Sequence, residues 1–229
     1  LYLQDRWKMT EQSTLLMGLR WDGVKVSDFS WNSYVQPRIS YQYQLAPKTT
    51  LKSYYGVYRQ YPSNAINSKF SGPNTLIRDP ANLGMELATH YGTGVEHFIG
   101  DDIRFKLEAF YKDYDQLSID TGTYPEETYK NKGVGKAGGI ELMLHKISGD
   151  DYDGWITYTF SKTRRKDVDG WFIPDFDVTH MINMYGDFKV GTANHLVTTI
   201  KYSTGLPYTP ILDRKSTRLN SSHLVISYA

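Results

Sequence analysis

Strict alternation of apolar and polar residues is the feature of this sequence that most limits its fold. Across residues 103–112, apolar side chains occupy every second position, and most of the positions between them are charged. Residues 35–45 repeat the pattern, with apolar residues and Pro37 alternating with Gln, Arg and Ser. A period of two is typical of a β-strand with one apolar and one polar face. An apolar exterior with a polar interior is what a transmembrane β-barrel requires.

Composition excludes several other classes of protein. The chain has 229 residues, of which 40% are hydrophobic and 14% aromatic, so a disordered polymer is excluded. A net charge of +1 without a block of like charge argues against a nucleic-acid partner. No apolar run of about 18 residues exists, which excludes a transmembrane helix but not barrel strands. The absence of cysteine removes disulfide and thiolate chemistry and suits an exported chain.

Short polar turns and longer polar segments alternate between the predicted strands. The strands are expected at residues 1–9, 14–22, 34–45, 51–61, 87–99, 103–120, 138–147, 154–164, 179–190 and 195–208. The longer segments are expected as loops at residues 23–33, 62–85, 121–137 and 165–177. Outer-membrane barrels have short periplasmic turns and long extracellular loops. The sequence therefore predicts an all-β, antiparallel, up-and-down transmembrane sheet.

A series of sequence motifs resembles those of one known family. They are YLQDRW, GLRWD, QPRISYQYQL, YYGVYRQYP, MELATHYGTGVEHF, FKLEAFYKDY, KNKGVGKAGGIEL, ITYTFSKT, FDVTHMINMYG and YSTGLPYTP. In this order, over nearly all of residues 1–212, they resemble the C-terminal barrel of TonB-dependent outer-membrane receptors. The resemblance implies a barrel of about 22 strands that encloses an N-terminal plug.

The resemblance also implies location, function and partners. Roughly ten strands can be read, so we expect an open, curved sheet from a larger barrel in the cell outer membrane. The implied activity is import of a scarce ligand, such as an iron chelate, cobalamin or a glycan. The implied partners are outer-membrane lipid, the small ligand, and the TonB energy-coupling complex, which acts through a plug region that this sequence lacks. We expect the fragment alone to transport nothing.

The last 17 residues have a different character. Residues 213–229 lose both the alternation and the aromatic richness, and they resemble the in-frame translation of a sequencing adapter. Sequence of this origin has to be excluded from fold reasoning. We therefore expect a partial barrel domain at residues 1–212 and no domain at residues 213–229.

No catalytic or metal site is predicted. Asp175, Asp177 and His180 could suggest metal binding, but they match a family motif that opens a strand, and no nucleophile or spaced ligand set accompanies them. The chain is therefore expected not to be an enzyme and to need no cofactor. Two alternatives stay open: an outer-membrane barrel enzyme or adhesin, and a soluble tyrosine-rich sandwich with apolar residues on facing sheets.

Alternation also predicts which face each strand residue occupies. The lipid-facing set is expected to include Phe105, Leu107, Ile39, Leu142, Leu144, Ile182, Met184 and Ile200. Polar-face residues are expected to line the lumen and contact the plug, namely Arg20, Arg38, Arg104, Glu108 and Glu141. Tyrosines near strand ends are expected in interfacial girdles, namely Tyr54, Tyr55, Tyr58, Tyr61, Tyr111 and Tyr114.

Ligand recognition is expected at the long loops and their roots, where hydrogen-bonding groups and aromatic faces combine. The predicted ligand-binding residues are Tyr58, Arg59, Gln60, Asn64, Lys69, Asn74, Arg78, Trp171 and Phe172.

Overall fold

The computed structural model describes residues 1–27, 30–60, 83–122, 129–147, 151–191 and 194–207. These residues form eleven β-strands in one sheet. The strands are β1 (Tyr2–Lys8), β2 (Ser13–Ser27), β3 (Ser30–Ala46), β4 (Thr49–Gln60), β5 (Glu86–Ile99), β6 (Ile103–Asp120), β7 (Tyr129–Lys146), β8 (Tyr152–Asp167), β9 (Gly170–Phe172), β10 (His180–Val190) and β11 (Asn194–Ser203). No helix of the described residues is long and apolar enough to cross a membrane.

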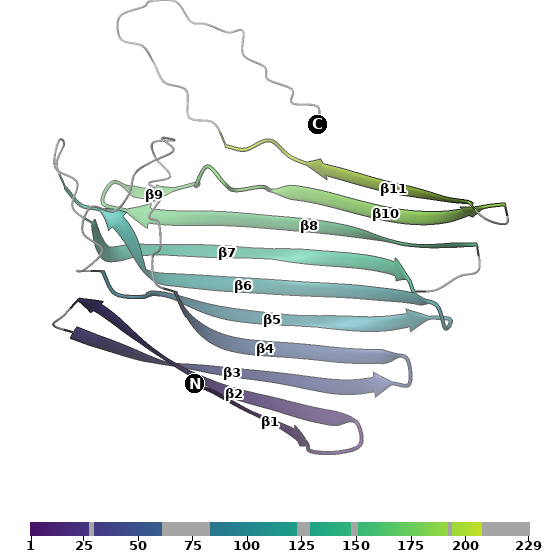
Figure 1. Cartoon of the computed structure of the whole chain (residues 1–229), viewed down its shortest axis with the longest axis horizontal. Helices are drawn as coiled ribbons and strands as arrows, with labels where there is room; N and C mark the ends of the chain where they lie inside the picture. Colours follow the sequence, from purple (N-terminus) through teal and green to yellow (C-terminus); the bar gives the residue numbers. More distant parts are fainter. Residues whose placement is uncertain (28–29, 61–82, 123–128, 148–150, 192–193, 208–229) are drawn as a thin grey trace, which may run out of the picture.

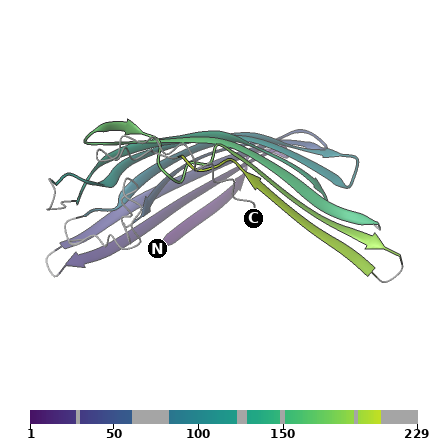
Figure 2. The same cartoon turned by 90° about the horizontal axis from the view of Figure 1, so that it is seen from above.

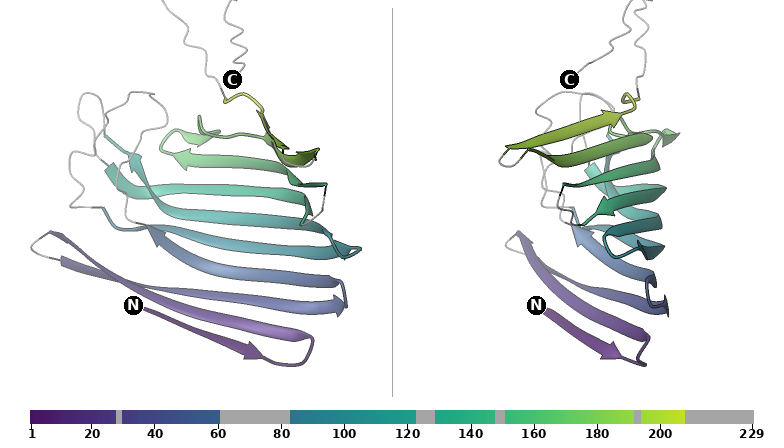
Figure 3. Two further views of the ribbon diagram at one scale, coloured as in Figure 1. Left: turned by 45° about the vertical axis from the view of Figure 1, so that its right-hand side comes forward. Right: turned by 90° about the vertical axis from the view of Figure 1, so that its right-hand side faces the viewer.

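The strands follow one another across the sheet in sequence order. The path runs from β1 to β8 and continues through β10 to β11, while the short β9 pairs only with β8 (Figure 1). All pairings are antiparallel. The sheet is arched and its two ends stay apart, as seen from above and from the side (Figures 2 and 3). The predicted open, up-and-down antiparallel sheet is confirmed.

Three of the predicted loops are wrong because strands run through much of them. β2 and β3 continue through most of residues 23–33, β7 begins at Tyr129 instead of at residue 138, and β8 with β9 takes up residues 165–167 and 170–172. The ladder of paired residues continues through these extensions, although Gly, Ser, Asn and Lys are frequent in their sequence. Residues 61–82 and 208–229, which include most of the predicted loop 62–85 and the whole predicted tail, lie outside the described residues.

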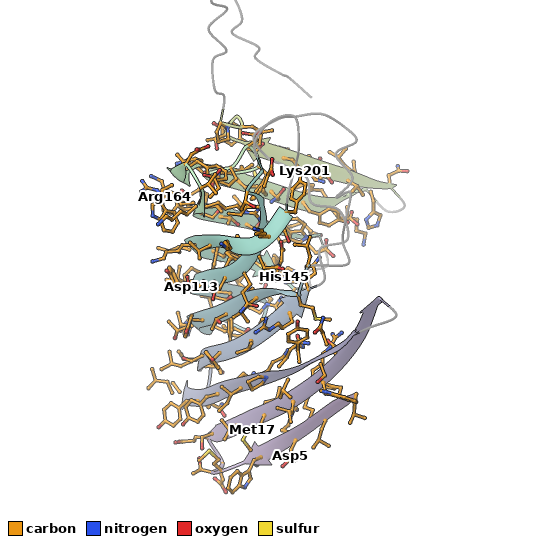
Figure 4. The ribbon with its side chains drawn as sticks, turned by 90° about the vertical axis from the view of Figure 1, so that its left-hand side faces the viewer. Asp5, Met17, Asp113, His145, Arg164 and Lys201 are labelled. Atoms are coloured by element: carbon orange, nitrogen blue, oxygen red, sulfur yellow. The ribbon has the colours of Figure 1, made fainter. Side chains whose placement is uncertain are left out.

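Cross-strand register sorts the side chains onto two faces, because residues directly opposite each other share a face. Leu107 lies opposite Leu142, which lies opposite Tyr158, which in turn lies opposite Ile182. The same parity places all eight predicted lipid-facing residues on one face, and Arg38, Arg104 and Glu141 on the other. Figure 4 shows the first face as convex, with Asp113 and Arg164 on it, and His145 on the concave side. The predicted register is confirmed.

The convex face carries an apolar band of membrane dimensions. On β6 the band runs from Ile103 to Tyr111, which is about 27 Å along the strand at about 3.4 Å per residue. A strand tilted by about 40° would then cover about 21 Å, close to the apolar height of outer-membrane barrels. On β8 the band ends at Phe160, after which Lys162 follows on the same face.

A packed core is almost absent from the described residues. Their buried hydrophobic side chains are Leu83, Met85, Leu117 and Ala137. In contrast, the convex Leu107 is 37% exposed and Ile200 is 50% exposed. A soluble sandwich would bury such residues between two sheets, so the single sheet contradicts that alternative.

The predicted girdle tyrosines divide between the two faces. Tyr55, Tyr91 and Tyr111 form a convex row with ring centroids 5.3 and 6.3 Å apart. The parity of β4 and β6 puts Tyr54, Tyr58 and Tyr114 on the concave face, so the girdle prediction is wrong for these three. Sequence spacing shows that tyrosines gather near a strand end, but two adjacent tyrosines always point to opposite faces. Tyr61 lies outside the described residues.

Candidate ligand-facing site

A row of aromatic and cationic side chains crosses the concave face next to the long connections. Tyr58 on β4 lies opposite Ala88 on β5, and Ala88 lies opposite Tyr114 on β6. Tyr114 lies opposite Gly135 on β7, which lies opposite Arg165 on β8. The register therefore brings residues from five strands to one level of the sheet.

Direct contacts extend this row to neighbouring levels. The ring centroids of Tyr58 and His90 lie 4.4 Å apart, and those of His90 and Tyr114 lie 6.5 Å apart. The guanidinium carbon of Arg38 lies 4.5 Å from the centroid of the Tyr58 ring. Arg38, Tyr58, His90, Tyr114 and Arg165 are called the concave row below. At its far end, the Arg165 guanidinium carbon lies 4.9 Å from the Phe176 ring centroid.

Glycines let the aromatic rings lie close to the sheet. A Cβ atom on Gly56 would lie 2.8 Å from a ring carbon of Tyr58, and one on Gly92 would lie 2.3 Å from the Tyr54 ring. Both rings therefore occupy the space that a side chain would need. The concave face consequently presents flat aromatic surfaces beside its cations.

Two members of the row, Tyr114 and Arg165, lie beyond the level of the apolar band, and burial shifts the pKa of each. Burial raises the pKa of the Tyr114 hydroxyl, so it is a neutral hydrogen-bonding group at physiological pH. Burial also lowers the pKa of Arg165, although a guanidinium keeps its proton in proteins. At the other end of the row, the Nε atom of Arg38 is buried and has no hydrogen-bond partner among the described residues. The row thus holds fixed positive charge with unused hydrogen-bonding capacity.

Further toward the short turns, the concave face carries paired charges. Lys52 contacts Glu96 at 2.9 Å, and Lys106 contacts Glu108 at 2.9 Å. The Tyr54 hydroxyl donates to Glu108 at 3.1 Å. A cavity of about 330 Å³ lies among these side chains. The Nε atom of Arg104, which also lines the cavity, is buried and without a partner among the described residues.

The predicted Arg59 belongs to a polar network at the root of the β4–β5 connection. Its Nη1 atom donates to the carbonyl of Met85 at 3.2 Å and to Oε1 of Gln116 at 2.6 Å. Its backbone N–H donates to Oε1 of Gln36, a side chain that is 1% exposed. Pairing between β3 and β4 ends at Arg38, so Gln36 takes the place of a backbone partner for Arg59. These contacts hold the end of β4 against the start of β5.

Asn131 of β7 closes the same network from the other side. Its side chain accepts from the N–H of Gly84 at 2.7 Å and donates to the carbonyls of Gly84 and Gln116 at 3.1 and 2.8 Å. Gln116 has a φ of 55° at an irregularity of β6, which turns its carbonyl out of the ladder. The chain before β5 is therefore anchored to β6 and β7.

The other predicted ligand-binding residues are spread over several places. Gln60 is exposed at the end of β4, whereas Trp171 and Phe172 lie opposite Lys166 and Arg165 and therefore on different faces. Only Tyr58 belongs to the concave row. Four predicted residues lie outside the described residues, namely Asn64, Lys69, Asn74 and Arg78.

Four members of the row were missing from the predicted ligand-binding set: Arg38, which was predicted as a lumen-lining residue, and His90, Tyr114 and Arg165. The alternation alone could have put each of them on the polar face of its strand. The level at which each stands depends on strand register and on the irregularity of β6, neither of which the sequence spacing gives.

The PDFDVTH segment has the structural role that the sequence predicted. Asp177 is buried, and its Oδ1 atom accepts from the backbone N–H of Thr163 at 2.7 Å. His180 begins β10, and its Nδ1 atom lies 2.9 Å from the hydroxyl of Tyr158. Within the described part of the chain, no three His, Asp or Glu side chains gather into a metal-binding group.

Comparison with known proteins places the chain in a family. A family model described as "TonB dependent receptor-like, beta-barrel" matches residues 1–220. No curated protein matches the chain.

Three solved structures share its fold. The alcaligin outer-membrane receptor FauA from Bordetella pertussis has a TM-score of 0.64 at 18% identity, over 89% of this chain and 36% of that one. The ferric-catecholate import receptor Fiu from K12 E. coli has a TM-score of 0.67 at 15% identity, over 88% and 33%. The siderophore receptor PirA from Pseudomonas aeruginosa has a TM-score of 0.62 at 21% identity, over 88% and 37%. The chain thus spans about a third of these proteins. It belongs to the TonB-dependent receptor family, which is a family of transporters and not of enzymes, and forms part of the β-barrel.

Proposed function

We propose that this chain is part of an outer-membrane receptor that imports a scarce anionic ligand by TonB-dependent transport, with an iron chelate as the first ligand class to test. The observation that carries the proposal is the concave row, in which two guanidinium groups lie against aromatic rings. The names of FauA, Fiu and PirA refer to alcaligin, a ferric catecholate and a siderophore, which supports the same class. Cobalamin and glycans are the other classes known in the family.

The chemistry of the row suits a chelate with oxygen donors. Arginine binds pairs of anionic oxygens with two parallel hydrogen bonds, and it also stacks on flat rings. The Arg38 guanidinium offers such donors beside the Tyr58 ring, and the rings of Tyr58 and His90 offer flat surfaces. A neutral glycan would use the rings but would gain little from the two cations.

The paired charges nearer the short turns fit a different partner. We propose that the cavity among Lys52, Glu96, Arg104 and Glu108 contacts the plug of the complete receptor, and that the plug couples the barrel to the TonB complex. The buried Nε of Arg104, without a partner among the described residues, would find an acceptor there. The open sheet of this chain does not enclose a lumen, so transport would require the remaining strands and the plug.

The test of the row uses the full-length receptor that contains this sequence. Replacing Arg38 and Arg165 together by glutamine should weaken binding of the ferric chelate by at least about 100-fold, because hydrogen bonds to charged groups contribute about 1.5–3 kcal/mol each. Binding is measured by titration of tryptophan fluorescence in detergent micelles. The matched control replaces Lys189 and Lys201, two exposed concave lysines away from the row, by glutamine. Equal affinities of the two double variants would contradict the proposal.

The predicted loop residues require their own experiment. Alanine at Asn64, Lys69, Asn74 and Arg78 together should reduce cell-surface binding of the chelate at least about tenfold if these polar groups make the first contacts with it. Heat-modifiable gel mobility checks that the barrel has assembled. Uptake and surface binding equal to those of the parent receptor would contradict the assignment of this loop to ligand binding.

A further inference from the structure

Four exposed cations stand on the convex face, where a membrane protein would normally present apolar residues. They are Lys136 of β7 and Lys162, Arg164 and Lys166 of β8. The register gives all four the same parity as Leu142 and Tyr158 of the apolar band. Figure 4 shows Arg164 on the convex side. These four residues are called the convex basic patch.

The arrangement of the patch is unfavourable without a bound anion. Lys136 lies directly opposite Arg164, and like charges in such a cross-strand pair repel. Lys162 and Lys166 flank Arg164 at the adjacent positions of the same face. The ion pairs formed among the described residues include none of the four. Asp113 lies opposite Lys136 on its other side, and Asp115 stands two residues further along the same face of β6. These two negative charges leave the patch of four cations net positive.

A cavity of about 440 Å³ lies within the patch. It is lined by Lys136, Lys162 and Arg164, and by the apolar surfaces of Tyr111, Ala137, Gly138 and Trp171. Trp171 is 48% exposed, and the Nζ atom of Lys136 lies 5.9 Å from its ring centroid. Cations on one side and aromatic surface on the other make the cavity amphipathic.

The level of the patch matches the boundary between membrane and water. On β8 the apolar residues Ile156, Tyr158 and Phe160 are followed on the same face by Lys162. The patch lies at the end of the sheet with the longer connections, which is the extracellular end in outer-membrane barrels. Tryptophan and tyrosine are typical of such a boundary, where their rings sit at the level of lipid headgroups.

We propose that the convex basic patch binds a phosphorylated lipid headgroup of the outer leaflet. The cations contact its phosphates, and Tyr111 and Trp171 contact the adjoining apolar part of the lipid. A lipid is favoured over a soluble phosphate because the cavity lies on the outer wall, continuous with the apolar band and turned away from the lumen. The inference needs only the membrane position of the barrel, so it does not depend on which ligand is imported. Trp171 then has a role at the membrane boundary and not at the lumen.

The test measures lipid binding by the full-length receptor in detergent micelles. The probe is lipid A, a bisphosphorylated glycolipid, and native mass spectrometry quantifies the bound fraction as lipid A is added. The Lys136→Gln, Arg164→Gln double variant should bind lipid A about 30-fold more weakly, because it removes two of the cations that attract the anionic lipid. The control is the Lys8→Gln, Lys189→Gln variant, which removes two exposed lysines near the short turns. It should bind lipid A like the parent.

Each outcome decides the proposal. Loss of lipid A binding in the patch variant alone, with unchanged heat-modifiable mobility and unchanged chelate affinity, supports it. Equal binding by the patch variant and the control overturns it. Inorganic phosphate or a deacylated headgroup that competes as strongly as lipid A also overturns it, because the site would then recognise soluble phosphate. Should the double variant fail to assemble, the parent receptor still provides a test, since a bound fraction that does not fall as salt rises from about 50 to 500 mM overturns the charge-based mechanism.

Discussion

Arginine in place of Leu107 is expected to destabilise the assembled receptor by about 2–4 kcal/mol, the cost of a cation on the lipid side near the bilayer midplane. Leu107 lies in the middle of the apolar band of β6, with Val95 and Leu142 directly opposite on the same face. The side chain has no polar partner there and cannot reach water without distorting the bilayer. Urea unfolding of the full-length receptor in phospholipid vesicles measures the change.

The same substitution at Thr89 provides a control for depth. Thr89 of β5 stands on the same face, directly opposite Asp113 and beyond the end of the band. Arginine near the interface costs about 0–1 kcal/mol, and Asp113 offers it a counter-charge, so Thr89→Arg should unfold close to the parent. A similar loss of stability at the two positions would mean that the convex face does not contact lipid as the register indicates.

Valine in place of Gly139 is expected to prevent assembly of the barrel. A Cβ atom on Gly139 would lie 2.1 Å from the carbonyl oxygen of Phe160 on β8 and 2.9 Å from the Phe110 ring on β6. The first neighbour is backbone, so relief requires separation of β7 from β8 and not a simple change of rotamer. Overpacking usually costs about 1–3 kcal/mol, and the two strands would also lose ladder hydrogen bonds, so the total should exceed 3 kcal/mol. Heat-modifiable mobility and protease resistance in outer-membrane fractions report assembly.

The adjacent glycine is the matched control. A Cβ atom on Gly138 would come no closer than 3.3 Å to its nearest neighbour, the Tyr111 ring. Gly138→Ala should therefore leave the amount of assembled receptor nearly unchanged, whereas Gly139→Ala should already reduce it. Normal assembly of both Gly139 variants would show that β7 and β8 are further apart than the structure places them.

The half of the sheet that carries the apolar band could be predicted from sequence because an apolar convex face and a polar concave face impose a strict period of two. This period located β4 and β6 almost to the residue and assigned the faces of Ile39, Phe105 and Leu142 correctly. The pairing within each short-turn hairpin followed as well, since a short turn joins two adjacent antiparallel strands.

The half of the sheet beyond the apolar band could not be predicted in the same way. Gly, Asn and Lys are frequent in the continuation of β7 to Tyr129, and β9 has only three residues, so neither shows an alternation of apolar and polar residues. Arg59 was predicted as a ligand contact because it stands beside a long loop; in the structure its Nη1 atom donates to the carbonyl of Met85 and to Gln116. Such a network depends on the side chain of Gln36 and on the irregularity of β6, which are properties of tertiary structure.

The sequence-ordered pairing of the strands has a consequence for how this sheet can form. Each strand from β2 to β8 needs only the preceding strand as a template, and the longest connection among them is residues 61–85, so the cost in loop entropy stays modest. Growth can therefore proceed one hairpin at a time from either end, and contacts between distant parts of the sequence are not needed to begin. The outer edges of β1 and β11 keep free backbone donors and acceptors throughout, ready to pair with a further strand. In a complete barrel, the first strand pairs with the last. This pairing is the step that joins residues far apart in the chain, and it sets the final diameter of the barrel.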